Sequence, residues 1–238
     1  MGVVAELILI RHGESASNVA FPLANERGLV DSGLSGRDAD VELTEWGAEQ
    51  AAAVGRWLAA LPPEHRPEVV ITSPYRRARE TWRIAAAASG LELPAPTTDE
   101  RLVDRLLGDL EMLTEAAIRQ RFPAEPERYR RAGEYLYRPP GGESFGDIAK
   151  RLSSFLDDLN REHAGERVAV VAHDSVVLMA RAVIEGLDWP ALAAVAATGR
   201  VLNASITRFD GDGSAGRDGS GRLVLASYNA VDHLPPAP

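Results

Sequence analysis

The sequence predicts an α/β fold of three layers, in which helices cover both faces of a mostly parallel central sheet. Continuous apolar runs at residues 5–11, 68–73 and 167–172 predict buried strands, because a strand covered on both faces needs no polar alternation. Helical patterns lie between these runs, and such alternation favours parallel strands. No repeat or linker divides the chain, so residues 1–238 are expected to form one domain.

The segment after the first strand divides into an excursion and a helix. Residues 19–43 are rich in Gly, Asp and Ser and have no clear period, and long ordered loops of this kind tend to be functional. Thr44 is a suitable N-cap for a helix that runs to about Ala60, because Trp, Val and Leu residues follow it at mostly helical spacing. The stretch LPPEHRP then turns the chain into the second strand.

The second strand is expected to lead into another helix. Ser73 and Pro74 fit an N-cap followed by proline at the first helical position, where no backbone donor is needed. This helix is expected to end at Ser89, because Gly90 suits the left-handed conformation that closes a helix. Residues 113–121 are expected to be helical as well.

A second irregular segment follows at residues 122–142, which prolines and glycines interrupt. Together with residues 19–43, this segment is expected to form the wall of a substrate site. Its Tyr135, Tyr137 and Arg138 could line that site or could simply pack the segment.

The last part of the chain completes the predicted sheet. From Glu143, apolar residues trace one face of a helix that precedes the strand at 167–172. Another helix follows that strand and extends to about Glu185. Residues 203–210 and 222–229 flank a Gly/Asp/Ser loop and predict a late hairpin.

Composition narrows the classes of function. The chain has no cysteine, which excludes disulfides, thiolate metal sites and cysteine nucleophiles. Its net charge of −9, from 26 basic and 35 acidic residues, argues against nucleic-acid binding, which depends on neutralising phosphates. No apolar run approaches the roughly 20 residues that span a bilayer, and no leader pattern is present. We expect a cytoplasmic protein without membrane or nucleic-acid partners; the sequence is compatible with a homo-oligomer but does not fix one.

Unusual polar groups follow each of the three predicted strands. The first strand ends in Arg11 and His12, the second in Ser73, and the third in His173 and Asp174. Because the carboxyl ends of parallel strands lie at one edge of a sheet, where ligands bind in open α/β folds, we expect these side chains to meet.

The helix after the second strand has an electrostatic liability. Arg76, Arg77 and Arg79 lie in its first turns, where the partly positive helix end disfavours each cation by about 0.3–1 kcal/mol. A phosphate in front of this helix would make the arginines favourable. Taken singly, a histidine after a strand could be a structural residue, and the arginines could form a solvated helix face. The placement of histidines and arginines at the same edge of the sheet favours a site that binds a phosphoryl group.

Several motifs resemble those of the histidine phosphatase superfamily, the phosphoglycerate mutase-like proteins. LILIRHGESASN resembles the family signature, and ITSPYRRARET resembles its second arginine motif. VELTEWGAEQA resembles the start of the first long helix, and PPGGESFGDIAKRL and VVAHDSVV resemble a later helix start and the second histidine. The resemblance spans most of the chain and implies the phosphoglycerate mutase-like fold.

The resemblance also implies a role for each matching residue. Neutral His12 would attack phosphorus and form a phosphohistidine, which suits an imidazole with an unperturbed pKa of about 6.5. Arg11, Arg77 and His173 would stabilise the phosphoryl charge, and Asn18 would add a side-chain amide. These groups make a metal redundant, so neither a metal nor a cofactor is expected. The stretch GDGSAG at 211–216 matches a dinucleotide-binding pattern, but no helix pattern follows it, so we expect a hairpin loop.

Two positions depart from the family pattern. Asp104 stands where many members have the glutamate that protonates the leaving group, and Glu100 and Glu111 are the alternative acids. Asp174 stands where glycine is frequent. Its carboxylate could cap the following helix, repel a second anionic group of the substrate, or bind a substrate hydroxyl.

Three functions are consistent with these motifs. The preferred one is a metal-independent phosphatase of small phosphomonoesters, such as sugar or polyol phosphates. The alternative is a phosphoglycerate mutase, for which Arg130 and Arg131 are the nearest candidates to hold a second anionic group. An inactive phosphate-binding or scaffold module is the third.

Overall fold

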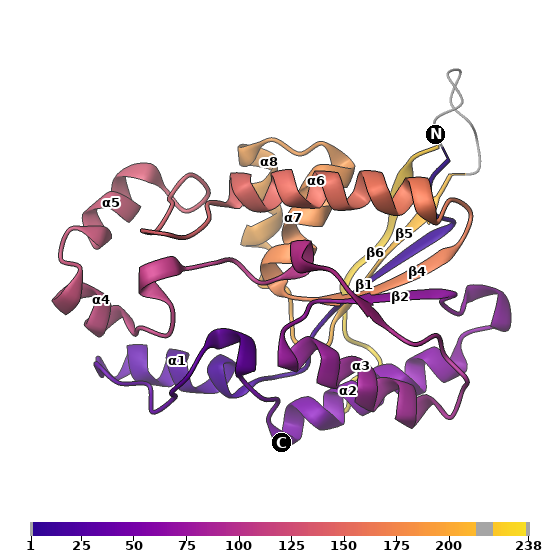
Figure 1. Ribbon diagram of the computed structural model, residues 1–238, viewed down its shortest axis with the longest axis horizontal. Helices are drawn as coiled ribbons and strands as arrows, with labels where there is room; N and C mark the ends of the chain where they lie inside the picture. Colours follow the sequence, from indigo (N-terminus) through magenta and orange to yellow (C-terminus); the bar gives the residue numbers. More distant parts are fainter. Residues whose placement is uncertain (1, 213–220, 237–238) are drawn as a thin grey trace.

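The computed structural model describes residues 2–212 and 221–236 (Figure 1). In this part of the chain, one mixed sheet has the strand order β3-β2-β4-β1-β5-β6. Its strands are β1 (Glu6–Arg11), β2 (Val69–Thr72), β3 (Thr97–Thr98), β4 (Arg167–Ala172), β5 (Ile206–Gly211) and β6 (Leu223–Ala230). The first four run parallel, and β5 pairs antiparallel with both β1 and β6. The predicted hairpin is therefore confirmed, although most of its GDGSAG loop lies outside the described residues.

Helices cover both faces of the sheet, as predicted. In Figure 1, α2 and α3 lie below the sheet and α6, α7 and α8 lie above it. The helices are α1 (Ala16–Glu26), α2 (Glu45–Ala60), α3 (Arg76–Ser89), α4 (Glu115–Arg121), α5 (Glu125–Ala132), α6 (Phe145–Glu162), α7 (Asp174–Glu185) and α8 (Trp189–Ala197), with short 3-10 turns η1 (Asp38–Asp40), η2 (Pro63–His65), η3 (Glu100–Leu102) and η4 (Gly108–Leu110). Within the described ranges, no helix is long and apolar enough to cross a bilayer. The cytoplasmic location stays a prediction.

The apolar run of β1 is continuous because it contributes to two separate cores. Leu7 and Leu9 pack into the cluster formed with α6 and α7, whereas Ile8 and Ile10 pack into the cluster formed with α2 and α3. Successive strand residues point to opposite faces, so a strand between two helical layers must be apolar at every position.

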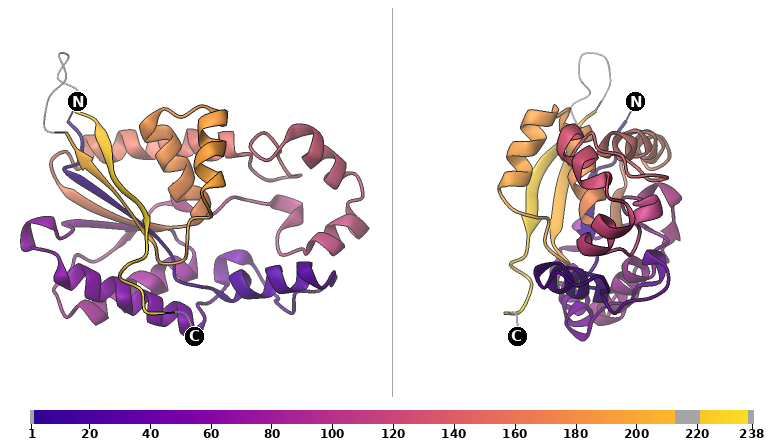
Figure 2. Two further views of the ribbon diagram at one scale, coloured as in Figure 1. Left: turned by 180° about the vertical axis from the view of Figure 1, so that it is seen from behind. Right: turned by 90° about the vertical axis from the view of Figure 1, so that its left-hand side faces the viewer.

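The parallel register brings the strand ends together. Arg11 of β1 pairs with Ala172 of β4, and Thr72 of β2 pairs with Val171. The polar residues that follow these strands therefore leave the sheet at the same edge, as expected. The left view of Figure 2 shows α1, α4 and α5 extending beyond this edge.

The expectation of an aperiodic excursion at residues 19–43 is wrong for its first part, which belongs to α1. Two features hide this helix in the sequence. Pro22 lies inside it and cannot donate the helical hydrogen bond. Val19 and Leu23 are exposed, so its apolar residues do not mark a core face.

Residues 122–142 also contain a helix, α5, where the sequence predicted irregular chain. The hydroxyl of Tyr137 donates to Glu125 of this helix at 2.6 Å, and the Tyr135 ring stacks on Trp189 at 5.5 Å. Of the two interpretations left open for these tyrosines, packing of the segment is the one that their contacts support.

The predicted start of α3 needs correction. Ser73 is not its N-cap and Pro74 is not its first residue; the helix begins at Arg76 after Tyr75. The Ser73 hydroxyl instead accepts from the Tyr75 N–H at 3.3 Å and contacts His173. Ser73 is thus drawn into the edge of the sheet where the polar groups gather.

The other predicted helix ends are confirmed. The Thr44 hydroxyl accepts from the N–H of Gly47 at 2.9 Å at the start of α2. Gly90 ends α3 with a left-handed φ of 64°, which favours glycine. The helix α8 and the short strand β3 have no counterpart in the sequence-based prediction.

Candidate active site

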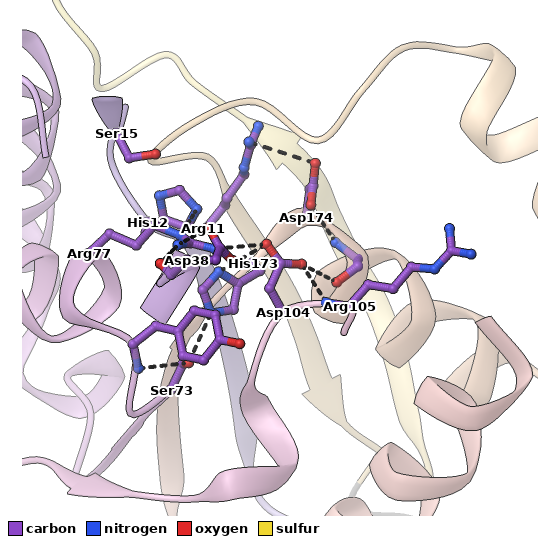
Figure 3. A network of polar contacts seen from close by, with 12 residues as sticks. Arg11, His12, Ser15, Asp38, Ser73, Arg77, Asp104, Arg105, His173 and Asp174 are labelled. Atoms are coloured by element: carbon purple, nitrogen blue, oxygen red, sulfur yellow. Dashed lines mark hydrogen bonds and ion pairs between the residues drawn. The ribbon is translucent and has the colours of Figure 1, made fainter. Parts of the chain in front are cut away.

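A pocket of about 330 Å³ opens at the edge where β1, β2 and β4 end. Its lining comprises Arg11, His12, Ser17, Asn18, Phe21, Asp38, Tyr75, Arg77, Asp104, Arg105, Leu106, Leu107, Glu111, Met112, Leu113, Phe145, Asp174 and Ser175. Every site residue predicted from the sequence lines it except His173, which lies behind the wall beside Asp104. Figure 3 shows the side chains of His12, Arg77 and Asp104 converging from separate segments. Of the two alternative acids, Glu111 lines the pocket and Glu100 does not.

Residues 122–142 contribute no side chain to this lining. Glu125, Tyr129 and Tyr137 instead border a second cavity of about 450 Å³, which shares Arg105 with the first. The role of this segment as a substrate wall stays a prediction.

His12 has the geometry of a nucleophile. Its Nδ1 lies 2.7 Å from the carbonyl oxygen of Gly13, so Nδ1 carries the ring proton and Nε2 keeps its lone pair. The Nε–H of Arg77 donates to this lone pair at 3.2 Å. Burial, followed by the positive charge of Arg77 and the influence of His173 and Arg11, lowers the pKa of His12 well below its usual value. The imidazole is therefore neutral.

Gly13 permits a close backbone approach behind His12. A Cβ atom on Gly13 would overlap the carbonyl group of Gly47 at the start of α2. The N–H of Gly13 donates to the hydroxyl of Thr81 at 3.0 Å. This contact anchors the turn that presents the nucleophile.

Arg77 lies at the centre of the site and is 2% exposed. Its Nη1 donates to the backbone oxygen of Asp38 at 2.7 Å and to its Oδ1 at 2.9 Å. Its Nη2 donates to Oδ2 of Asp38 and to Oδ2 of Asp104, both at 3.0 Å. With Nε on His12, all five guanidinium donors have partners.

The other arginines of this helix start do not enter the pocket. Arg76 pairs with Glu42 at 2.5 Å and with Glu80 at 2.9 Å near the surface. Arg79 is exposed. The cluster inferred from the sequence therefore supplies one buried cation, Arg77, and two surface cations.

Arg11 supplies a second cation. Its Nη1 donates to the carbonyl of Val201 at 2.6 Å, and its Nη2 lies 3.7 Å from Oδ2 of Asp174. Its Nε is buried and has no hydrogen-bond partner among the described residues. A buried donor without a partner is costly, so an anion at this position would be stabilising.

Asp174 does not cap α7, contrary to the first of its three expected roles. The N-cap position belongs to His173, and Asp174 is the first helical residue. Its Oδ1 accepts from the N–H of Ser175 at 2.7 Å, and its side chain lines the pocket near Arg11. Burial raises the pKa of Asp174 despite the nearby arginine.

His173 is fully buried and is oriented by Ser73. Its Nε2 lies 2.8 Å from the Ser73 hydroxyl, which already accepts from the N–H of Tyr75. The hydroxyl proton is therefore free to be donated to Nε2, which places the ring proton of His173 on Nδ1. This nitrogen faces Oδ2 of Asp104 at 3.5 Å and makes no hydrogen bond with the described residues.

The two histidine rings are close neighbours, with centroids 5.1 Å apart. Burial lowers the pKa of His173 to about 3, with the Asp104 carboxylate opposing this shift and Arg77 adding to it. His173 is consequently a neutral hydrogen-bond donor rather than a cation.

Asp104 is held as a carboxylate by its surroundings. Its Oδ1 accepts from the Ser175 hydroxyl at 2.7 Å and from the N–H of Arg105 at 2.8 Å. Burial by itself would raise its pKa, but the positive charge of Arg77 and these hydrogen bonds keep the pKa well below the usual range. Asp104 can donate a proton only after its surroundings change.

Asn18 lines the pocket and uses its side-chain oxygen for contacts within the protein. Its Oδ1 accepts from the N–H of Ser15 at 3.1 Å and from Nδ2 of Asn203 at 3.0 Å. Asn203 also donates to the backbone oxygen of His12 at 3.2 Å. The oxygen of Asn18 is thereby occupied, and its NH2 group remains for a ligand.

Sequence reasoning missed several contributors. Asp38 and Asn203 gave no signal, because they lie in no recognised motif, and Ser175 was part of a quoted motif without a role being assigned to it. Tyr75 was part of a quoted motif; its ring contacts His173 edge-on and lies under the Arg77 guanidinium at 5.0 Å. Among the described residues, no three His, Cys, Asp or Glu side chains are grouped so as to hold a metal ion.

Comparisons with known proteins identify relatives with phosphoryl chemistry. Residues 7–217 match the model of the histidine phosphatase superfamily (branch 1). The chain is 32% identical to a 2,3-bisphosphoglycerate-dependent phosphoglycerate mutase of Methylorubrum populi, over 79% of this chain and 83% of that protein. It is 30% identical to a metal-independent phosphoserine phosphatase of Arabidopsis thaliana, over 85% and 75%. A mycobacterial glucosyl-3-phosphoglycerate phosphatase, solved with VO3, has a TM-score of 0.69 and 28% identity, over 95% of this chain and 100% of that chain.

Proposed function

The chain belongs to the histidine phosphatase superfamily, whose members are phosphatases or mutases, and on this premise we propose that it is a metal-independent phosphatase of small phosphomonoesters. The observation that carries the proposal is the surroundings of His12. A neutral imidazole with an unprotonated Nε2, whose lone pair accepts from Arg77, lies within one pocket with Arg11 and Arg77, beside His173. This is the combination that in-line attack on a phosphoryl group requires.

A phosphoryl group in front of His12 would meet donors on several sides. The unpartnered Nε of Arg11, the Nδ1–H of His173 and the amide of Asn18 are suited to its oxygens. Hydrogen bonds from such preorganised donors stabilise the charge that spreads over the oxygens in the transition state.

The first chemical step forms a phosphohistidine. Nε2 of His12 attacks phosphorus, the P–N bond forms, and the ester P–O bond breaks with its electron pair on the leaving oxygen. Asp104 gives that oxygen a proton. The bound dianion makes this proton available, because a like charge nearby raises the pKa of a carboxyl group.

The second step returns the enzyme to its starting state. Water attacks phosphorus and gives its proton to Asp104, which is a carboxylate after the first step. The P–N bond breaks, its electron pair returns to Nε2 of His12, and inorganic phosphate leaves. Asp104 thereby regains from water the proton that it gave to the leaving oxygen, and it releases this proton when phosphate leaves and the resting carboxylate forms again.

The mutase alternative is favoured by one observation, the identity with the mutase of Methylorubrum populi. A mutase must hold a second anionic group, and the pocket does not favour one. Arg130 and Arg131, the sequence candidates for this task, are exposed and pair with Glu127. Asp174 and Glu111 present carboxylates to the pocket instead.

Arg105 is the remaining cation in the lining, and two of its five donors are engaged elsewhere. Its Nε donates to the backbone oxygen of Glu143 at 3.0 Å and its Nη2 to that of Tyr137 at 2.8 Å. In Figure 3 its side chain extends away from the two histidines. These contacts favour hydrolysis of monoesters with one anionic group, such as sugar or polyol phosphates.

One pair of assays decides between phosphatase activity and phosphoglycerate mutase activity. We expect the protein to release inorganic phosphate from p-nitrophenyl phosphate in the presence of EDTA, and to interconvert 3- and 2-phosphoglycerate poorly. A panel of phosphorylated metabolites then identifies the substrate. Fast interconversion with negligible phosphate release would reverse this assignment.

His12→Ala tests the nucleophile and the scaffold alternative together. We expect the variant to fold, as judged by its circular dichroism and thermal unfolding, and to lose turnover. Acid-sensitive, alkali-stable labelling of the wild type by a 32P-labelled substrate should also disappear. Equal activity in the variant and the wild type would contradict the role of His12, and an inactive wild type would favour a scaffold.

A further inference from the structure

We propose that Asp38 is a built-in competitor of the substrate, which occupies the anion-binding side of Arg77 and yields this place to an incoming phosphoryl group. The proposal rests on the proposed function, because it concerns the same phosphate site. Neither a motif nor the resemblance points to Asp38, which lies in the 19–43 segment on the 3-10 turn η1.

The first argument is the number of donors on Arg77. Both oxygens of the Asp38 carboxylate bind its two terminal nitrogens, at 2.9 and 3.0 Å. This two-pronged geometry is the one with which a guanidinium holds a phosphate. All five donors are engaged, so Arg77 can bind a phosphoryl group only if one partner leaves.

The second argument shows which partner leaves. Asp104 is held by the Ser175 hydroxyl and the N–H of Arg105, in addition to Arg77. The Asp38 side chain is about as exposed as that of Asp104, at 24% against 23%, but among the described residues its carboxylate has hydrogen bonds to Arg77 alone. Beyond Arg77, its own N–H donates to Oε1 of Glu111 at 3.0 Å. Asp38 is therefore the partner that can turn outward into water.

The third argument is the balance of charge. The pocket gathers the carboxylates of Asp38, Asp104, Glu111 and Asp174 around the cations that face the histidines. A phosphate dianion placed beside Asp104 and Asp38 would be repelled by both, whereas departure of Asp38 removes one of these charges from the centre.

The environment of Asp38 already disfavours its charge. Burial raises the pKa of Asp38, the carboxylates of Asp104 and Glu111 add to this effect, and Arg77 opposes it. Tyr75 is the other titratable group nearby. The stabilisation of the Asp38 charge by Arg77 is thus partly offset by burial and by the nearby carboxylates, which makes exchange of Asp38 for a phosphate feasible.

The displacement would also release the nucleophile. In this structure the Nε–H of Arg77 binds the lone pair of His12 Nε2, while Asp38 fixes the far side of the same guanidinium. When a phosphoryl group replaces Asp38, the guanidinium is free to follow the phosphoryl oxygens, and Nε2 is free to attack. Asp38 thereby couples substrate arrival to activation of His12.

Asp38→Asn removes the charge and keeps the side-chain shape, and Asp40→Asn is a matched control. Asp40 lies in the same turn, but it pairs with exposed Arg37. We expect Asp38→Asn to bind inorganic phosphate about tenfold more tightly by calorimetry, since a hydrogen-bonded ion pair no longer has to be broken. KM for p-nitrophenyl phosphate should fall in parallel with little change in kcat, and Asp40→Asn should match the wild type.

The two possible failures have different signatures. If the wild type hydrolyses the ester and binds phosphate, but Asp38→Asn binds phosphate equally or more weakly, Asp38 positions Arg77 and the competitor proposal is wrong. If the wild type does neither and Asp38→Asn does neither, the proposed function fails as well. Asp38→Ser, compared by thermal unfolding, provides a second variant should the asparagine protein not fold; tighter phosphate binding by either variant supports the proposal.

Discussion

Replacing Asp104 with asparagine separates the proton that Asp104 is proposed to deliver from the contacts that its carboxylate makes. The amide oxygen can still accept from the Ser175 hydroxyl and the N–H of Arg105, which bind Oδ1. The amide nitrogen would then face Nη2 of Arg77 and Nδ1 of His173, which are both donors. The variant therefore loses one charge-assisted hydrogen bond, worth about 1.5–3 kcal/mol, and the ability to protonate a leaving group.

These two losses affect substrates differently. A displaced Arg77 weakens phosphoryl binding for every ester to the same degree. A missing proton matters only where the leaving oxygen is basic, and general acid catalysis contributes about 10²–10⁴-fold there. We therefore expect kcat/KM for an alkyl phosphate to fall at least about 100-fold more than kcat/KM for p-nitrophenyl phosphate.

The assay compares kcat/KM for glycerol phosphate and p-nitrophenyl phosphate in the wild type and Asp104→Asn. Asp109→Asn is the matched control, because Asp109 is exposed on the nearby turn η4 and does not line the pocket. Equal losses on both esters would refute the role of Asp104 as acid. If Glu111→Gln then showed the selective loss, Glu111 would be the donor, since it is the alternative acid that lines the pocket.

Two further predictions concern the histidines. Ser73→Ala leaves the buried Nε2 of His173 without its partner, so we expect a loss of about 1–3 kcal/mol in urea unfolding and a lower kcat/KM, and an unchanged rate would contradict the orienting role of Ser73. The pKa of His173 is about 3 in the folded protein and about 6.5 in the unfolded chain, so below about pH 6.5 the unfolded chain binds a proton that the folded protein does not. As the pH falls from about 6.5 to 5, His173 alone should therefore lower the free energy of unfolding by about 2 kcal/mol. The lowered pKa of His12 acts in the same direction. The raised pKa values of Asp38 and Asp174 oppose this loss of stability at lower pH. Urea titrations across this range measure the slope, and a flat profile would mean that His173 is not held neutral.

Much of the architecture could be predicted because it is encoded locally. Apolar runs such as residues 5–11 predict a buried strand without knowledge of their neighbours, and the ends of α2 and α3 carry their own signals in Thr44 and Gly90. The meeting of Arg11, His12 and His173 followed from one further assumption, that the strands are parallel. The family motifs then assigned chemistry to these positions.

Contacts between distant segments were beyond such reasoning. Asp38 and Arg77 are 39 residues apart, and Arg11 donates to a carbonyl 190 residues further on. The stretch around Asp38 gave no periodic signal, and α1 was hidden because its apolar residues face outward. Ser73 illustrates the same limit, since its hydroxyl binds His173, 100 residues away, rather than capping the helix beside it.

The sequence alone determined that Arg11, His12, Ser73, His173 and Asp174 lie at one end of the sheet, because neighbouring residues indicate where each buried strand runs and where it ends. Only the tertiary structure decided the partners and protonation of those side chains. Both depend on burial and on charges brought close by folding, as the neutral His173 and the fully engaged Arg77 demonstrate. Electrostatic interactions depend on distance in space, and that distance is set by the packing of the whole chain.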